Sequence, residues 1–274
     1  MRISLLYFSS TGNTRLLADH ARDWLECHRA AATVHEVLKS RPVAVLDCEL
    51  LIVFYPVWGS DMPEPLQVFF EGVEHASTEH IKRPAVALVG NCGIFTGDTG
   101  VYWKSRLERR GWDVVYADHA LMPVNINVPN FNLWKVPRAA EREEIIRRGG
   151  RKLERILAGI LAGERRYVGS GPLDHLGGWL QRTFYEPGLR VWKDELAVAA
   201  ERCTRCGLCQ RMCPTANITL GDDGVGFGGE CIFCLKCFNL CPAGAVLVGA
   251  RSRDREQYRR YKGPTGTPRP ELYR

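Results

Sequence analysis

An α/β fold is predicted for this chain: a doubly wound, five-stranded parallel sheet followed by a small α+β domain. Two observations predict it. Short apolar runs rich in Val, Ile and Leu alternate with helical patterns through the first 163 residues, and this alternation is typical of buried parallel strands joined by helices. Eight of the eleven cysteines then fall between positions 203 and 241, which marks a second, compact unit.

The alternation gives the elements of the first domain in order. Apolar runs predict strands at 2–8, 32–37, 50–56, 84–90 and 113–118. Patterns between them predict helices at 13–28, 63–73 and 98–110. A longer helix is expected over 138–163, because apolar residues recur on one face, although Gly149 and Gly150 weaken its middle. Residues 120–137, rich in proline and asparagine, predict a long ordered loop.

The chain is expected to divide into four parts. Residues 1–163 form the sheet domain, 164–195 a linker, 196–250 the cysteine domain and 251–274 a basic tail. The linker is predicted to hold a short amphipathic helix with the apolar residues Leu176, Trp179, Leu180 and Phe184. We expect this helix to pack between the domains; the alternative is a helix that docks on a membrane surface or a partner. Short strands are predicted in the cysteine domain at 196–200, 218–220, 225–227 and 246–248.

Composition and charge narrow the class of protein. The chain has 274 residues and 45% hydrophobic content, as ordinary globular proteins do. No run approaches the roughly 18 apolar residues of a membrane span, and the first apolar stretch is too short for a secretory signal. The net charge is +6, and the tail, with eight basic and three acidic residues, carries most of it. We therefore expect no nucleic-acid binding by the chain as a whole. The tail is either a solvated terminus, a docking site for an acidic partner, or a contact to nucleic acid or anionic lipid.

The clustered cysteines form two quartets, "CTRCGLCQRMCP" at 203–214 and "CIFCLKCFNLCP" at 231–242. Each has the spacing C-x2-C-x2-C-x3-C-P. This spacing carries cubane [4Fe–4S] clusters in bacterial two-cluster proteins, where the fourth cysteine of each run binds the other cluster. It predicts one cluster on Cys203, Cys206, Cys209 and Cys241, and a second on Cys213, Cys231, Cys234 and Cys237.

Zinc sites and disulfides are the alternatives for these cysteines. Zinc sites use pairs of C-x2-C rather than triplets, and dense disulfide frameworks belong to small secreted proteins. Because no secretory signal is predicted, we expect reduced cysteines and a cytoplasmic, oxygen-poor location. The scattered Cys27 and Cys48 are expected in the core.

The loop after the first strand, "SSTGNT" at 9–14, predicts an anion site. It joins an apolar strand to a helix and offers hydroxyls, backbone N–H groups and a helix N-terminus without a cation. The G-x4-GK-[ST] pattern of nucleotide-triphosphate loops and the G-x-G-x-x-G pattern of dinucleotide sites are both absent. The loop therefore predicts a monophosphate ligand, and an ordinary capped helix is the alternative.

This loop resembles the FMN phosphate loop of the flavodoxins, and the resemblance covers about residues 1–163. It implies that the flavin ring lies between two further loops, "YPVWGSDMPEP" at 55–65 and "VGNCGIFTGDTG" at 89–100. Trp58 is implied to cover the ring, with a core tryptophan as the alternative. Cys92 and Phe95 stand where the family often carries a tyrosine, and Cys92 is otherwise a small buried residue. The implied cofactor-binding residues are Ser9, Ser10, Thr11, Gly12, Asn13, Thr14, Pro56, Val57, Trp58, Gly59, Asn91, Cys92, Gly93, Phe95 and Gly97.

Both halves together resemble the flavodoxin–ferredoxin fusion proteins of anaerobic bacteria and archaea, over about residues 1–250. The resemblance implies electron exchange between FMN and two [4Fe–4S] clusters. It also implies redox partner proteins, either a ferredoxin-like donor or acceptor or a larger oxidoreductase.

Three functions remain open at this point. The first is an electron carrier between protein partners, which an open flavin edge would favour. The second is an FMN-dependent reductase of a small molecule or of a metal cofactor held by a partner. A closed pocket roofed by Asn125, Asn127, Phe131 and Trp134 would favour it. The third is a redox sensor or assembly subunit that its tail docks onto an acidic partner. No acid–base constellation stands out for a separate catalytic centre.

Overall fold

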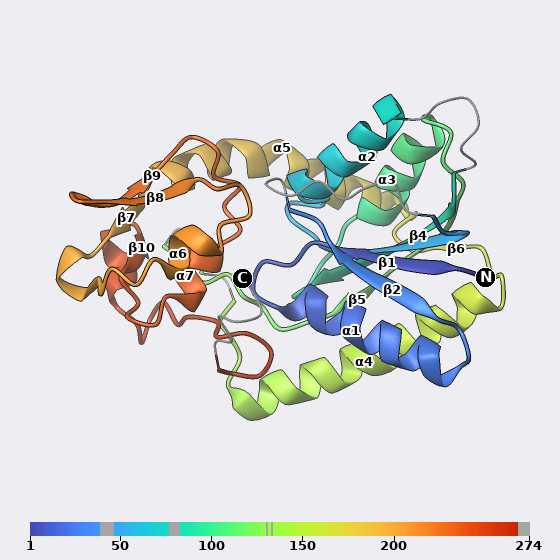
Figure 1. Ribbon diagram of the computed structural model, residues 1–274, viewed down its shortest axis with the longest axis horizontal. Coiled ribbons are helices and arrows are strands. Elements are labelled where there is room, and N and C mark those ends of the chain that lie inside the picture. The colour runs from blue at the N-terminus through green and yellow to red at the C-terminus, as the bar shows by residue number, and fades with distance from the viewer. Residues whose placement is uncertain (39–46, 77–82, 130, 133, 268–274) are drawn as a thin grey trace.

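The computed structural model in Figure 1 describes residues 1–38, 47–76, 83–129, 131–132 and 134–267. Its main sheet is parallel throughout, with the strand order β2-β1-β3-β4-β5-β6. The first five strands are β1 (Ile3–Tyr7), β2 (Ala32–Glu36), β3 (Leu50–Pro56), β4 (Ala85–Cys92) and β5 (Val114–Leu121). These match the five predicted strands, and the doubly wound parallel sheet is confirmed.

Helices cover both faces of this sheet (Figure 1). On one face lie α1 (Asn13–Cys27) and α4 (Ala139–Leu161), and on the other α2 (Glu64–Ala76) and α3 (Thr99–Glu108). Every residue of β3 is buried, because each strand face meets a helix layer. Two apolar cores result, one around Leu17 and Leu157 and the other around Phe70 and Trp103.

The strand order reverses direction at β1, and this reversal places the site. From β1 the chain crosses to β2 on one side, while β3 continues the sheet on the other. In open α/β sheets, ligands bind in the crevice outside the carboxyl ends of the strands at this switch point, and the order 2-1-3-4-5 is that of flavodoxin. The loops after β1, β3 and β4 meet there, as predicted.

A sixth strand, β6 (Arg166–Tyr167), differs from the expected five. The chain leaving α4 returns along the edge of β5, where Ala117 pairs with Tyr167. The guanidinium of Arg166 lies 3.4 Å from the carboxylate of Asp118 on that strand. Two residues give no apolar run, so a pattern search does not detect this strand.

Gly149 does not interrupt α4, contrary to the weakness expected there. A Cβ atom at Gly149 would lie 2.6 Å from the backbone oxygen of Leu121. The missing side chain therefore allows the helix to approach the end of β5 closely.

The predicted short linker helix is instead the 23-residue α5 (Pro172–Asp194). It runs from the sheet domain to the cysteine domain (Figure 1). The apolar residues that predicted it are exposed rather than packed: the exposed fractions of Trp179 and Phe184 are 58% and 70%. The helix is held to the sheet domain by polar groups, which the apolar pattern does not reveal.

The second domain is small and α+β, as predicted. It pairs β7 (Leu196–Val198) with β10 (Val246–Val248), and β8 (Ile218–Gly221) with β9 (Gly224–Phe227), both antiparallel. The helices α6 (Leu208–Arg211) and α7 (Lys236–Leu240) and the 3-10 turns η1 (Ala200–Arg202) and η2 (Ala250–Arg253) complete it.

The tail is packed in its central part. Tyr258 and Tyr261 are 2% and 1% exposed, so residues 258–261 are not part of a solvated terminus, whereas residues 253–257 are exposed. Residues 268–274 of the predicted tail lie outside the described residues. Among the described residues, no helix is both long and apolar enough to cross a membrane.

Candidate functional site

A cavity of about 470 Å³ opens at the switch point of the sheet, and we call it the central cavity. It is of the size and character of a small-molecule site, concave and lined mainly by apolar and aromatic side chains with a few polar groups. Its walls come from the loops after β1, β3, β4 and β5, from α5 and from the second cysteine loop. The predicted residues that line it are Ser10, Asn13, Thr14, Pro56, Val57, Trp58, Gly59, Asn91, Cys92, Gly93 and Phe95.

The other predicted residues of the first loop shape it from behind. Gly12 has a positive φ of 104° at the start of α1, and its N–H donates to Ser9 Oγ at 3.1 Å. Thr11 Oγ1 accepts from Asn125 Nδ2 at 2.8 Å. No side chain in the described chain caps α1, so its first amides remain available to an anion. The loop therefore fits the monophosphate of a flavin nucleotide.

The loop after β3 is held against α5. Gly59 has a positive φ of 56°, and a Cβ atom there would lie 2.4 Å from Cγ of Tyr185. The next residue, Ser60, donates from Oγ to Gln181 at 2.6 Å. Trp58 is half-buried, packs edge-on against Phe8 at 5.6 Å and lines the cavity. It is therefore placed to contact a ligand and is not a fully buried core residue.

The loop after β4 contributes backbone and a neutral thiol. Asn91 Nδ2 donates to Thr14 Oγ1 at 2.8 Å, which joins this loop to the first one. Burial raises the pKa of Cys92 to about 12, so its side chain is a thiol at neutral pH and a poor nucleophile. Gly97 does not line the cavity: it packs between Ser60 and Gly178 of α5.

A buried ion pair fixes α5 to this loop. Asp98 stands at the N-cap position of α3 but makes no capping bond. Its carboxylate accepts from Arg182 at 2.6 and 3.1 Å and lies 3.0 Å from His175 Nδ1. Burial alone would raise the pKa of Asp98, but the bonds from Arg182 and His175 outweigh it and lower that pKa.

The roof considered for a closed pocket is only partly formed. Asn125, Phe131 and Trp134 line the central cavity. Asn127 does not: its Nδ2 donates to the backbone oxygen of Gln257 in the tail, at 3.1 Å. Trp134 is 40% exposed, so it forms part of the rim of the cavity.

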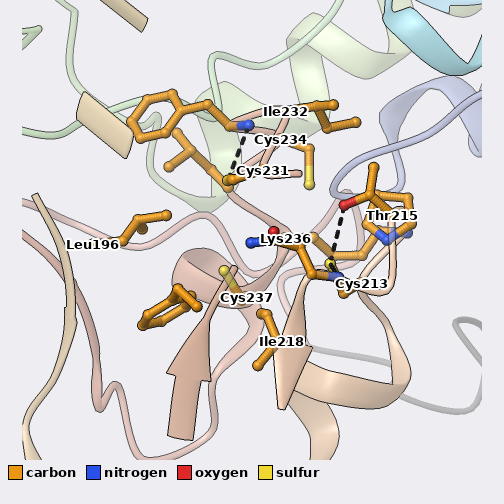
Figure 2. A pocket seen from close by; sticks show the side chains of 14 residues that line it. Leu196, Cys213, Thr215, Ile218, Cys231, Ile232, Cys234, Lys236 and Cys237 are labelled. Carbon is orange, nitrogen blue, oxygen red and sulfur yellow. Dashed lines mark hydrogen bonds between the residues drawn. The ribbon is translucent and has the colours of Figure 1, made fainter. Parts of the chain in front are cut away.

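The eight cysteines of the quartets surround two further cavities. The inner cavity is lined by Cys213, Cys231, Cys234 and Cys237 (Figure 2). The outer cavity is lined by Cys203, Cys206, Cys209 and Cys241. These are the two sets grouped by the sequence spacing, with the fourth cysteine of each run exchanged between them. Cys206 is exposed, whereas the other seven are partly buried.

The two cysteine loops repeat the same backbone geometry. Arg205 and Gly207 have positive φ in the first loop, and Phe233 and Leu235 have it at the equivalent places in the second. Left-handed residues of this kind, three of them not glycine, are costly. They turn successive N–H groups into a concave nest, which binds phosphates and iron–sulfur clusters.

Backbone N–H groups also reach the sulfur atoms. Asn217 N donates to Cys213 Sγ and Ala245 N to Cys241 Sγ, each at 3.3 Å and each four residues after its cysteine. In the inner cavity Phe233 N donates to Cys231 Sγ, also at 3.3 Å (Figure 2). Such bonds stabilise ligand thiolates and help to set the reduction potential of a cluster.

The donor chemistry fits iron–sulfur clusters, whose ligands are cysteine thiolates. Within the described ranges, no group of three or more His, Cys, Asp and Glu side chains is arranged to hold one metal ion. Burial raises the pKa of Cys234 to about 12 and that of Cys237 well above its usual value. Binding as thiolates therefore requires a compensating positive charge such as iron supplies.

The central and inner cavities share a wall. Phe233, Cys234 and Leu235 line both of them. The ring of Trp192 on α5 lies 5.5 Å from that of Phe233, stacked at 27°, and also lines the central cavity. One cysteine loop thus separates the central cavity from the inner one.

Sequence reasoning missed the contributions of α5 and the tail. Tyr185 and Trp192 line the central cavity from α5, and Tyr261 donates from its hydroxyl to Asn13 Oδ1 at 2.5 Å. The apolar pattern predicted a helix in the linker but did not show that Tyr185 and Trp192 face the cavity. The tail's basic charge gave no signal that Tyr261 contacts the first loop.

Comparison with known proteins gives matches in each half of the chain. The family model of the 4Fe-4S dicluster domain matches residues 196–242. The polyferredoxin protein MvhB of Methanothermobacter marburgensis is 40% identical over 53 residues, which span 19% of this chain and 13% of that protein.

Solved flavodoxins align with the first half. A short-chain flavodoxin associated with a non-canonical PDU bacterial microcompartment is 16% identical, with a TM-score of 0.40, over 59% of this chain and 97% of that one. Flavodoxin 2 from Bacillus cereus is 19% identical, with a TM-score of 0.40, over 58% and 99%. The strand order of the sheet itself defines the flavodoxin-like topology. The chain therefore joins a flavodoxin-like domain to a 4Fe-4S dicluster domain.

Proposed function

We propose that this chain is an electron-transfer protein that carries FMN in the central cavity and a [4Fe–4S] cluster in each cysteine cavity. The observation that carries the proposal is the shared wall of Phe233, Cys234 and Leu235 between the central and inner cavities. When bound, FMN exchanges one or two electrons and each cluster exchanges one. A single chain with both kinds of site connects one-electron and two-electron partners.

The residues around FMN have separate roles in this proposal. The loop 9–14 binds the phosphate through amides and hydroxyls, and Trp58 covers the ring from the β3 side. The α5 helix holds the β3 and β4 loops together through Arg182, which donates to the Ser60 carbonyl at 2.9 Å and to Asp98. The linker in this account is a rigid wall of the site rather than a tether.

We propose that the inner cluster is next to FMN and the outer cluster faces the partner. Two facts support this order: Cys234 lines the central cavity, and Cys206 in the outer set is exposed. Arg205 and Arg211 flank Cys206 and donate to backbone carbonyls rather than to carboxylates. Their charge favours an acidic redox protein at this face. We propose a cytoplasmic location, because reduced cysteines are typical of that compartment.

A reductase is the second candidate, and one observation favours it. The rim of the central cavity carries the exposed aromatic side chains Phe95, Trp134 and Phe184. They offer contact surfaces for a flat, apolar substrate.

Cofactor analysis combined with an anaerobic redox titration tests the proposal. We expect one FMN and about eight iron atoms per chain, and EPR signals from clusters that equilibrate with the flavin. A chain purified anaerobically with full flavin but without iron would contradict the proposed electron transfer between FMN and the clusters. Reduction of an added small acceptor at an undiminished rate in that iron-free chain would favour the reductase.

A further inference from the structure

The C-terminal segment 257–263 contains Arg260, a cation that is buried against the cysteine domain. Arg260 is 9% exposed. Its Nη1 donates to the backbone oxygen of Phe238 at 2.6 Å, and its Nη2 to that of Val246 at 2.8 Å. Its Cζ lies 3.3 Å from the centre of the Phe238 ring. These partners are polar or aromatic, and they leave the positive charge of the guanidinium uncompensated.

One guanidinium nitrogen has no partner. Nε of Arg260 is buried and makes no hydrogen bond to any residue that the structure describes. A buried cation is costly unless it is paired. Burial lowers the pKa of Arg260 to about 10, so the side chain is still charged at neutral pH. The fold therefore holds the positively charged guanidinium of Arg260 against carbonyl oxygens and an aromatic ring rather than against a carboxylate.

Arg260 lies beside the cluster cysteines. Its guanidinium stacks on the ring of Phe238, and Phe238 belongs to an apolar cluster against which Cys209, Cys237 and Cys241 pack. The contacts agree with this: Val246 lines the outer cavity. Lys236 is a second buried cation, in the wall of the inner cavity.

The position of Arg260 is fixed from both domains. The next residue, Tyr261, donates its backbone N–H to Asn239 Oδ1 of α7 at 2.9 Å and its hydroxyl to Asn13 Oδ1 of the first loop at 2.5 Å. Tyr258, two residues before Arg260, is also buried. The segment thus forms hydrogen bonds with both the sheet domain and the cysteine domain.

We propose that Arg260 sets the reduction potential of the [4Fe–4S] clusters, as a fixed positive charge delivered by the C-terminal segment. The inference rests on the proposed clusters. Reduction adds one electron to a cluster, and a nearby cation stabilises the more negative state, so Arg260 raises the potential. Net charge around a cluster is one of the properties that set it. The outer cluster feels the larger effect, because Val246, whose carbonyl accepts from Arg260, lines the outer cavity.

Three variants of the full chain test this role, with dithionite as the reductant in an anaerobic titration followed by EPR. R260Q removes the charge, and R260K keeps it. R259Q is the matched control: Arg259 is adjacent, half-exposed, and donates to the Val136 carbonyl at 3.3 Å. We expect R260Q to shift the reduction equilibrium of the outer cluster at least tenfold toward the oxidised state, which is about 59 mV for one electron. R260K and R259Q are expected to stay near wild type.

The measurements distinguish the absence of the clusters from the absence of an effect of Arg260 on their potential. A wild-type chain without iron would refute the proposed clusters themselves. Full iron in R260Q with an unchanged potential would refute the role of Arg260 alone. Loss of iron in R260Q but not in R260K would support a requirement for the charge, whereas equal loss in both would mean that the side chain is only a packing element.

Discussion

Replacing Gly59 with alanine tests whether α5 forms the wall of the central cavity. Gly59 has a positive φ of 56°, which costs a residue with a side chain about 1–2 kcal/mol. The added Cβ would also lie 2.4 Å from Cγ of Tyr185 and 2.6 Å from its Cβ. Neither is the flexible end of a side chain, so overpacking adds about 1–3 kcal/mol. The total is about 2–5 kcal/mol.

This strain is expected to appear in FMN binding, because relief requires either the β3 loop or α5 to move. A loss of 2 kcal/mol is about 30-fold in Kd. The assay is a fluorescence titration of the flavin-depleted full chain with FMN, together with thermal unfolding. G72A is the control: Gly72 lies in α2 with nothing within 4 Å of an added Cβ, and alanine there is expected to stabilise the helix by about 0.5–1 kcal/mol. Equal FMN affinity for G59A and wild type would refute the packing of Tyr185 on this turn.

Two further substitutions follow from the site. C234A is expected to lower the iron content by about half and to retain FMN. C92S should retain both cofactors, because Cys92 is a buried neutral thiol. Iron and flavin analysis distinguishes the two variants, and equal iron content in both would contradict the assignment of Cys234 as a cluster ligand. D98N should destabilise the chain at neutral pH by about 1.5–3 kcal/mol, through lost charged hydrogen bonds to Arg182. Because the folded pKa of Asp98 is lowered from its ordinary 3.8, this difference should persist at pH 5 and vanish only as pH falls below about 3.8 and through the lowered pKa. Melting curves that converge already at pH 5 would contradict this.

Local patterns predicted the sheet and the grouping of the cysteines well, for a physical reason. Strands such as 50–56 are buried on both faces and appear as continuous apolar runs. The C-x2-C-x2-C-x3-C-P spacing places Cys241 with the first triplet without any knowledge of the fold, because the turn after the fourth cysteine directs it away from its own run. The structure brings the same four side chains to the outer cavity.

The features that local patterns could not predict all depend on contacts between distant residues. Tyr185 meets Gly59 across 126 positions because the Asp98–Arg182 ion pair draws α5 onto the sheet domain. Arg260 is one of several arginines in a basic tail, and nothing in its local sequence distinguishes it from Arg259. Only the fold shows that one of the two is buried beside the cluster cysteines.

The order of the cofactors is tested most directly by the rate at which cluster absorbance bleaches after the flavin is photoreduced in the full chain. The shared wall at Cys234 predicts that C206A, which alters the exposed outer site, still shows flavin-driven bleaching of the inner cluster. It also predicts that C234A loses this bleaching while it retains FMN. Fast bleaching in C234A, or its loss in C206A alone, would contradict the proposed path from the central cavity through the inner cluster to the outer one.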